Sequence, residues 1–371
     1  TMTGARLNEA KLRGADLSRA RLDGAVLTSA DLSDADFEEA SLDGADLSGA
    51  IVTGARFKGA SLAGATFDRA GLGSASFAGV RLGAVCFDDM DLTDADFAGA
   101  DLSGSSFLRA NLTGADFEEA RLAGCDLRGA VLVETLFDGT DLSGVNLSGA
   151  DLTSATVSGC ALAGADLRAA KLFKAVLSGI SLRDVQLKGA RLVQSLFDEA
   201  DATGVDFSGC DLTDSMFSGA KLDGANLAGI VARQTNFAGA SLKRATMQRV
   251  DATSANLRGA CLDEADLREA IFEEACFEEV TMRKARAERA VFVGARFAKA
   301  DLSGTIFRNS RMKYADLSHA TLSGSDLSDV DLEQARLHRA TRDGASFRGA
   351  NMKNVDEDDP ALARAEDFRA G

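Results

Sequence analysis

The sequence predicts an all-β solenoid built from five-residue repeats, and three observations lead to this fold class. A large apolar residue, nearly always Leu or Phe, recurs at every fifth position from Met2 to about Val355. A small residue, usually Ala, recurs three positions after each large one. Of the 37 glycines, 33 occupy one further position of the same frame. A period of five fits neither the strand period nor the helix period.

We number each repeat so that position 1 is a residue whose number ends in 1 or 6. The large apolar residue is then position 2, glycine favours position 4, and the small residue is position 5. Glycine confined to one position indicates a tight turn that needs a positive φ. Positions 2 and 5 point inward and the other three face solvent. Since one repeat cannot bury its own apolar side chains, the repeats must stack along an axis.

The stretch "DEADLREAIFEEACFEEVTMRKARAERA", residues 263–290, tests this interpretation because its composition also suits a helix. The five-residue frame nevertheless continues through it, as Leu267, Phe272 and Phe277 show. An offset of twenty residues places Glu269 beside Arg289, whereas an offset of fifteen brings like charges together. Charge complementarity therefore predicts four repeats per coil, although each exposed pair contributes only ~0.2–1 kcal/mol.

Strings such as "KLRGADLSRA" and "NLTGADFEEA" resemble the pentapeptide repeat family, whose pattern is A-(D/N)-L-x-x. The resemblance implies a right-handed β-helix of square cross-section. We therefore expect an all-β, right-handed quadrilateral β-helix, with residues 1–355 forming a single uninterrupted domain. At twenty residues per coil, this domain would contain about 18 coils.

The two ends of the chain lead to different expectations. At the C-terminus, Asp359 and Pro360 suit an N-cap and a first helical residue, so we expect residues 356–371 to form a short cap helix or tail. The first coil has no such cap, which favours a fragment with a further domain upstream. Pairing of that coil with a second copy, as a homodimer or by end-to-end stacking, is the alternative.

The residues that could carry chemistry predict a protein that is not an enzyme and that needs no cofactor or metal. His319 and His338 fall on outward positions of the same side of the coil, and we expect both to be solvated. The six cysteines form no C-x-x-C pair. Cys125, Cys160 and Cys210 occupy position 5, where cysteine replaces alanine as a small apolar residue. A regular solenoid also lacks the concave site that small molecules use.

Charge is the remaining functional signal. The net charge of −16 argues against direct nucleic-acid binding, and residues 1–150 carry −12 of it. The twenty-residue offset places Asp96 beside Asp116 and Glu118 beside Asp138, which is unfavourable unless a cation relieves it. A solvated face that aids solubility is the alternative. We define the acidic face, a candidate protein-binding surface, as Asp94, Asp96, Asp116, Glu118, Glu119, Glu134 and Asp138.

The predicted function is a rigid, acidic interaction scaffold that binds a protein partner with a basic surface. The family resemblance implies a bacterial module of a larger protein, of the secretion-system or effector type. We expect a cytoplasmic location, or secretion as part of such a system, and no membrane span. The alternative is a DNA mimic that binds type II topoisomerase (gyrase) and protects it from quinolones. The length of this chain, its lack of functional loops and the position of its acidic part argue against that alternative.

Overall fold

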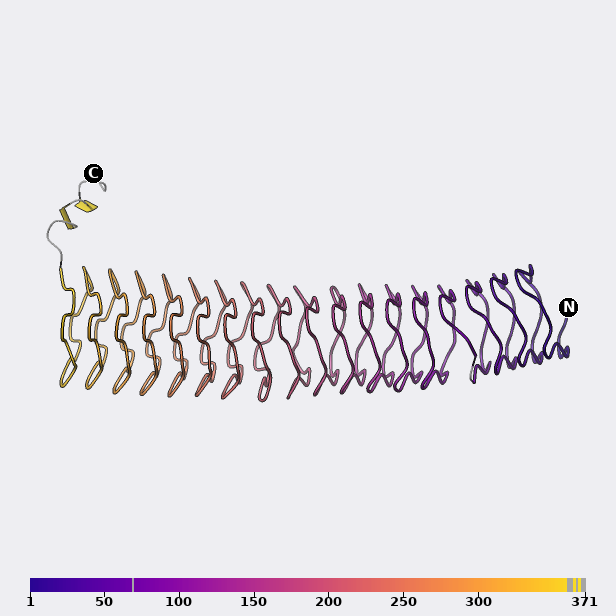
Figure 1. The fold of residues 1–371 in the computed structure, drawn as a ribbon, viewed down its shortest axis with the longest axis horizontal. Coiled ribbons are helices and arrows are strands. Elements are labelled where there is room, and N and C mark those ends of the chain that lie inside the picture. The colour runs from indigo at the N-terminus through magenta and orange to yellow at the C-terminus, as the bar shows by residue number, and fades with distance from the viewer. Residues whose placement is uncertain (69, 359–362, 365, 368–371) are drawn as a thin grey trace. The chain divides into compact units, whose positions relative to one another are not determined.

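The computed structural model describes residues 1–68, 70–358, 363, 364, 366 and 367 (Figure 1). The chain divides into two compact parts, Thr1–Arg191 and Leu192–Gly371, which we call the first and second parts. Within the described residues, helix occurs at 363–364 and 366–367, and the β structure consists of single-residue bridges. The predicted all-β, β-helix-type fold is therefore confirmed.

Every bridge is parallel and joins a position 1 residue to the residue twenty positions later. In the first part the bridges run from Arg6–Val26 to Lys171–Arg191, and in the second part from Leu196–Met216 to Arg336–Asp356. Twenty residues thus bring the chain back beside itself in each part, as the charge pattern predicts.

The hydrogen bonds of one repeat explain its composition. In residues 46–50, the amides of Asp46, Leu47 and Gly49 donate to carbonyls in the neighbouring coils at 2.7–2.9 Å. The amide of Ala50 closes the turn by donating to the carbonyl of Leu47 at 3.0 Å. The fifth amide, that of Ser48, donates to the Asp46 side chain at 3.0 Å. Asp or Asn at position 1 therefore satisfies a donor that the backbone ladder leaves unused.

Position 4 carries a positive φ throughout the described repeats, with one exception. Thirty-three glycines and 36 residues of other types share this conformation, so the turn itself imposes it whatever the side chain. The exception lies at residues 81–85, where Gly83 (φ 66°) takes the left-handed conformation in place of Ala84. Beside it, a hollow of about 350 Å³ is lined by Phe67, Val85, Cys86 and Met90 among others.

Replacing Ala169 with glycine is expected to raise the free energy of unfolding by up to about 1 kcal/mol. Ala169 has a φ of 56°, and its Cβ costs roughly 1–2 kcal/mol there. Glycine also has more freedom in the unfolded chain, and this offsets about 0.4–1 kcal/mol of the stabilisation. Ala163→Gly is the control, because Ala163 is an exposed position 3 residue without a positive φ. Urea titrations should show the control destabilised, and a destabilised Ala169→Gly would contradict the prediction.

Phenylalanine rings at position 2 are the largest side chains in the core of the first part. Phe37, Phe57, Phe77, Phe97 and Phe117 stack at centroid distances of 4.9–5.1 Å, with interplanar angles of 9° or less. A second column, Phe67, Phe87 and Phe107, comes from the opposite side of the coil. The two columns meet edge to face across the core, for example Phe107 against Phe117 at 6.1 Å. Position 5 alanines leave room for these rings, as the sequence pattern predicts.

Several position 5 residues are polar yet buried. Thr135 and Thr140 donate hydrogen bonds to the carbonyls of Leu112 and Phe117 at 2.9 and 2.6 Å. Cys125 and Cys160 lie in the same setting, and burial raises the pKa of their thiols to about 11 and about 12. These thiols are therefore protonated near neutral pH and poorly nucleophilic. The inward placement of Cys125, Cys160 and Cys210 is confirmed.

The charge pairs of residues 263–290 are confirmed only in part. Glu269 lies between Arg249 (2.8 Å) and Arg289 (2.6 Å), each one coil away, as predicted. Arg268, however, pairs with Asp266 of its own repeat at 2.5 Å, and not with Glu288, the residue that the twenty-residue offset places beside it. Arginine side chains are long, and positions 1 and 3 of one repeat leave the coil side by side. The nearer carboxylate therefore competes with the one a coil away.

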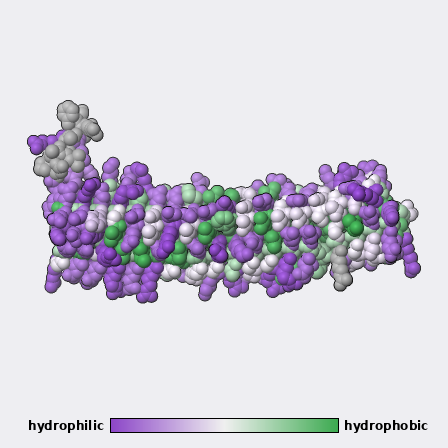
Figure 2. All heavy atoms as spheres, in the orientation of Figure 1, coloured by the Kyte–Doolittle hydropathy of each residue, from purple (hydrophilic) through white to green (hydrophobic). Residues whose placement is uncertain are grey.

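Polar residues cover most of the visible face, with apolar side chains in separate patches (Figure 2). The described residues contain no helix with the length and apolar composition needed to cross a membrane. The predicted cap helix falls largely on residues 359–362, 365 and 368–371, which lie outside the described residues. In the last coil, inward residues such as Ala345 and Phe347 are half-buried.

Candidate functional site

The acidic face is built on the backbone ladder of the first part. Asp96 and Asp116 are bridge partners, so these two carboxylates leave adjacent strands side by side. Asp96 accepts hydrogen bonds from the Ser76 hydroxyl at 2.7 Å and from the Ala98 amide at 3.0 Å. Asp116 accepts one from the Glu118 amide at 2.8 Å. The backbone register thus makes the two aspartates neighbours, as predicted, and each carboxylate also holds a turn.

Glu118 and Asp138 occupy position 3 in successive coils. The two coils are joined here by the Glu119 amide, which donates to the Asp138 carbonyl at 2.9 Å. Glu118 is exposed, whereas Asp138 is half-buried. Its Oδ1 atom is inaccessible to water and has no hydrogen-bond partner among the described residues. Asp138 therefore presents a carboxylate whose hydrogen bonding the described residues leave incomplete.

Asp94, Glu119 and Glu134 occupy position 4, where their φ values are 55°, 55° and 58°. Asp94 and Glu134 share a column but are two coils apart, with Gly114 between them. The Asp94 carboxylate lies over Gly114, where it would meet any Cβ added to that glycine. Glu119 belongs to the next repeat around the coil. The structure therefore brings Asp96 and Asp116 together directly and spreads these three residues around them.

A ladder of alternating charges bounds the acidic face. Arg81, Asp101 and Arg121 are successive bridge partners, and with Glu119 they line a hollow of about 530 Å³. Hydrogen bonds from Ser103, followed by the charges of Arg121 and Arg81, hold the pKa of Asp101 below its ordinary value. Glu119 thus lies beside alternating charges. The face is a local patch of unbalanced charge rather than a continuous acidic surface.

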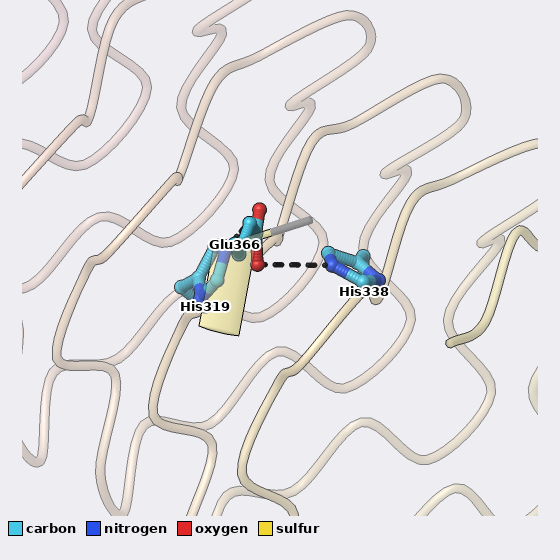
Figure 3. Close-up of side chains that lie close together, drawn as sticks. All are labelled: His319, His338 and Glu366. Carbon is cyan, nitrogen blue, oxygen red and sulfur yellow. Dashed lines mark hydrogen bonds and ion pairs between the residues drawn. The ribbon is translucent and has the colours of Figure 1, made fainter. Parts of the chain in front are cut away.

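A second cluster joins the tail to the last coils, and it includes both histidines of the chain (Figure 3). His319 Nε2 lies 3.3 Å from Glu366 Oε1, and His338 Nε2 lies 3.4 Å from Glu366 Oε2. Burial opposes ionisation of Glu366, but the contacts with His319 and His338 together outweigh it and lower the pKa of this carboxyl. Arg339 holds the same segment through Asp367 at 2.7 Å and the Ala363 carbonyl at 2.8 Å.

This tail cluster corrects the expectation that both histidines are solvated, because the side chain of His338 is only 5% exposed. Their spacing of nineteen residues on a twenty-residue coil places them on adjacent coils. The sequence did not predict the position of Glu366, because this residue lies beyond the last repeat and outside the five-residue frame. Within the described residues, these three side chains form a group that could hold a metal ion, with ligand atoms within 4.8 Å of one another.

Parallel single-residue bridges with a left-handed turn every five residues define the class of pentapeptide β-solenoids. The chain belongs to the pentapeptide repeat family. The model "Pentapeptide repeats (8 copies)" matches residues 2–38, 40–79, 91–129, 120–159, 130–168, 215–251, 253–286, 275–313 and 315–354. A second model, "Pentapeptide repeat region", matches residues 150–227. No curated protein matches the chain in sequence at a significant level.

Three solved structures illustrate the similarity. A pentapeptide repeat protein from the Arabidopsis thaliana thylakoid lumen is 28% identical over 27% of this chain and 66% of its own length, with a TM-score of 0.22. HetL, involved in heterocyst differentiation regulation in Nostoc sp. strain PCC 7120, is 26% identical over 76% and 88%, at 0.13. QnrB1, a plasmid-mediated fluoroquinolone resistance protein, is 22% identical over 53% and 95%, at 0.24.

Proposed function

We propose that this chain is a non-catalytic interaction scaffold whose acidic face binds a protein partner with a basic surface. The observation that carries the proposal is the bridge pair Asp96–Asp116, with Glu118 and Asp138 beside it. Like charges opposite each other destabilise a sheet, and a cationic side chain placed between them would relieve that repulsion.

Four bridge positions in every twenty residues support a four-sided coil, and about 18 such coils would account for the repeats. Right-handedness, a bacterial secretion-system context and a cytoplasmic location come from the family resemblance. The topoisomerase alternative calls for a DNA-like run of negative charge. The Arg81–Asp101–Arg121 ladder interrupts such a run, so we favour the scaffold.

The test removes charge without removing the turn hydrogen bonds. The face variant is Asp96→Asn, Asp116→Asn, Glu118→Gln and Asp138→Asn. Asparagine can accept the same turn hydrogen bond as aspartate, because the Ser148 amide donates to the Asn146 side chain at 3.1 Å. The control variant removes four charges from the second part. It is Asp211→Asn, Asp316→Asn, Asp331→Asn and Glu273→Gln, in which all three aspartates accept the same turn bond.

Affinity capture from the source cells is expected to yield a partner with wild type and control that is lost with the face variant. Binding of that purified partner should weaken as salt rises, because the contact is electrostatic. Melting temperatures of all three proteins establish that the loss is not due to unfolding. Equal capture by the face variant would contradict the proposal. Inhibition or protection of purified gyrase in a supercoiling assay would favour the DNA-mimic alternative instead.

A further inference from the structure

The tail cluster of His319, His338 and Glu366 has the composition and geometry of a metal site. The two histidines come from adjacent coils, which are joined by the His319 amide donating to the His338 carbonyl at 2.8 Å. Their rings lie 5.5 Å apart at an interplanar angle of 89°, and the Nε2 atom of each faces the Glu366 carboxylate (Figure 3). Two imidazoles and one carboxylate thus converge from three separate segments.

The two histidine–glutamate contacts are long for hydrogen bonds. The two Nε2–Oε separations are 3.3 and 3.4 Å, beyond the usual range for a nitrogen–oxygen hydrogen bond. Around a tetrahedral zinc ion with bonds of about 2.0–2.1 Å, neighbouring ligand atoms lie roughly 3.3–3.4 Å apart. The two histidine–carboxylate separations are close to this spacing, but they end on different oxygens of Glu366, and the three ligand atoms lie within 4.8 Å of one another. Binding of one ion by all three side chains therefore requires the cluster to close slightly around it.

The environment of the cluster also fits a three-ligand site. His338 is buried, while His319 and Glu366 are about one-third exposed, which leaves a side open for a solvent ligand. Arg339 Nε lies 3.4 Å from Glu366 Oε2, and Arg339 Nη2 contacts Asp367. Arg339 therefore holds the tail in place without metal and orients the carboxylate, as outer partners of metal ligands do.

We propose that His319, His338 and Glu366 bind one zinc ion and that the ion secures the tail to the side of the last coils. Among the common divalent ions, zinc is well suited to a donor set of imidazole nitrogen and carboxylate oxygen. The ion would link two coils and a segment outside the repeat frame. It would replace two long polar contacts by three metal–ligand bonds, so the tail should be held more firmly with zinc than without it.

Zinc binding is tested on the full chain after metal removal, by competition with a chromophoric chelator. Wild type is expected to bind one zinc equivalent, and His319→Asn or Glu366→Gln should weaken the affinity by more than about tenfold. Glu357→Gln is the matched control, because Glu357 is a nearby carboxylate that pairs with Arg342 at 3.5 Å. Cys86→Ser is a second control, and it tests whether the exposed Cys86 thiol contributes to zinc binding. Both of these variants should bind like wild type.

Two further readouts separate a metal site from simple ion pairing. The chain has two histidines, so NMR spectra of the imidazole nitrogens should show both rings shifting together as one equivalent is added. Proteolysis of the tail should slow with zinc in wild type and in Glu357→Gln, but not in Glu366→Gln. The proposal is overturned if the bound equivalent survives His319→Asn and Glu366→Gln. It is also overturned if wild type binds no zinc, or if zinc leaves tail cleavage unchanged.

Discussion

Replacing Phe97 with alanine is expected to lower the free energy of unfolding of the first part by about 3–5 kcal/mol. Phe97 is fully buried and stacks on Phe77 at 5.1 Å and on Phe117 at 5.0 Å. It also meets Phe87 and Phe107 edge to face, each at 6.1 Å. Truncation removes the ring and leaves a cavity, and the ladder hydrogen bonds above and below keep the coils from closing over it.

Two controls make the Phe97 result interpretable. Phe97→Leu should cost much less, about 1.5 kcal/mol or below, because leucine fills the same position in neighbouring repeats such as Leu92 and Leu102. Phe173→Ala should be close to neutral, since that ring is 38% exposed. Denaturant titration gives the free energies, and hydrogen exchange of the Phe77–Phe117 coils reports local opening, because solenoids can unfold in segments. A loss below about 1 kcal/mol in Phe97→Ala would contradict the packing account.

Acid is expected to destabilise this protein steeply below pH about 4, the ordinary titration range of aspartate. Hydrogen bonds from Ser48 hold the pKa of Asp46 below its ordinary value, those from Ser103 do so for Asp101, and those from Ser328 for Asp326. A pKa lowered by folding means that the unfolded chain binds the proton first. The resulting stability is present above the ordinary pKa and is lost as pH falls towards the folded-state value.

The effect should accumulate because the motif recurs in so many coils. Twelve described aspartates have pKa values lowered from the ordinary value, and all of them except Asp89, which pairs with Arg109, occupy position 1. The melting temperature should stay nearly constant from pH 7 to about 4 and then fall.

The matched variant is Asp46→Asn, Asp101→Asn and Asp326→Asn, which keeps the side-chain oxygen acceptor but cannot titrate. Asn111 shows that asparagine can fill this role, because it accepts from the Thr113 hydroxyl at 2.8 Å. The variant should lose less of its own stability than wild type between pH 4 and pH 2. Calorimetric scans at matched ionic strength measure the difference. Parallel melting curves for the two proteins would exclude these aspartates as the cause.

At the acidic face, the sequence predicted which residues are neighbours but not what their side chains contact. The twenty-residue offset correctly made Asp96 and Asp116 neighbours, because both are position 1 residues and the bridge joins that position to itself. It did not show the turn hydrogen bonds that each carboxylate makes or the Arg81–Asp101–Arg121 ladder beside Glu119. Whether the face binds a partner stays a prediction. A backbone register fixes which residues are adjacent, whereas side-chain rotamers decide what they contact.

The sequence by itself determined the repeat, the left-handed turn at position 4 and the apolar core, because each of these depends on neighbours at constant spacings of five and twenty residues. It also determined the buried setting of Cys125 and Cys160. Only the tertiary structure decided that Arg268 turns to Asp266, since a long arginine can reach several carboxylates. Likewise, only the tertiary structure brought Glu366 to His319 and His338, because the tail lies outside the repeat frame and its position depends on side-chain contacts alone.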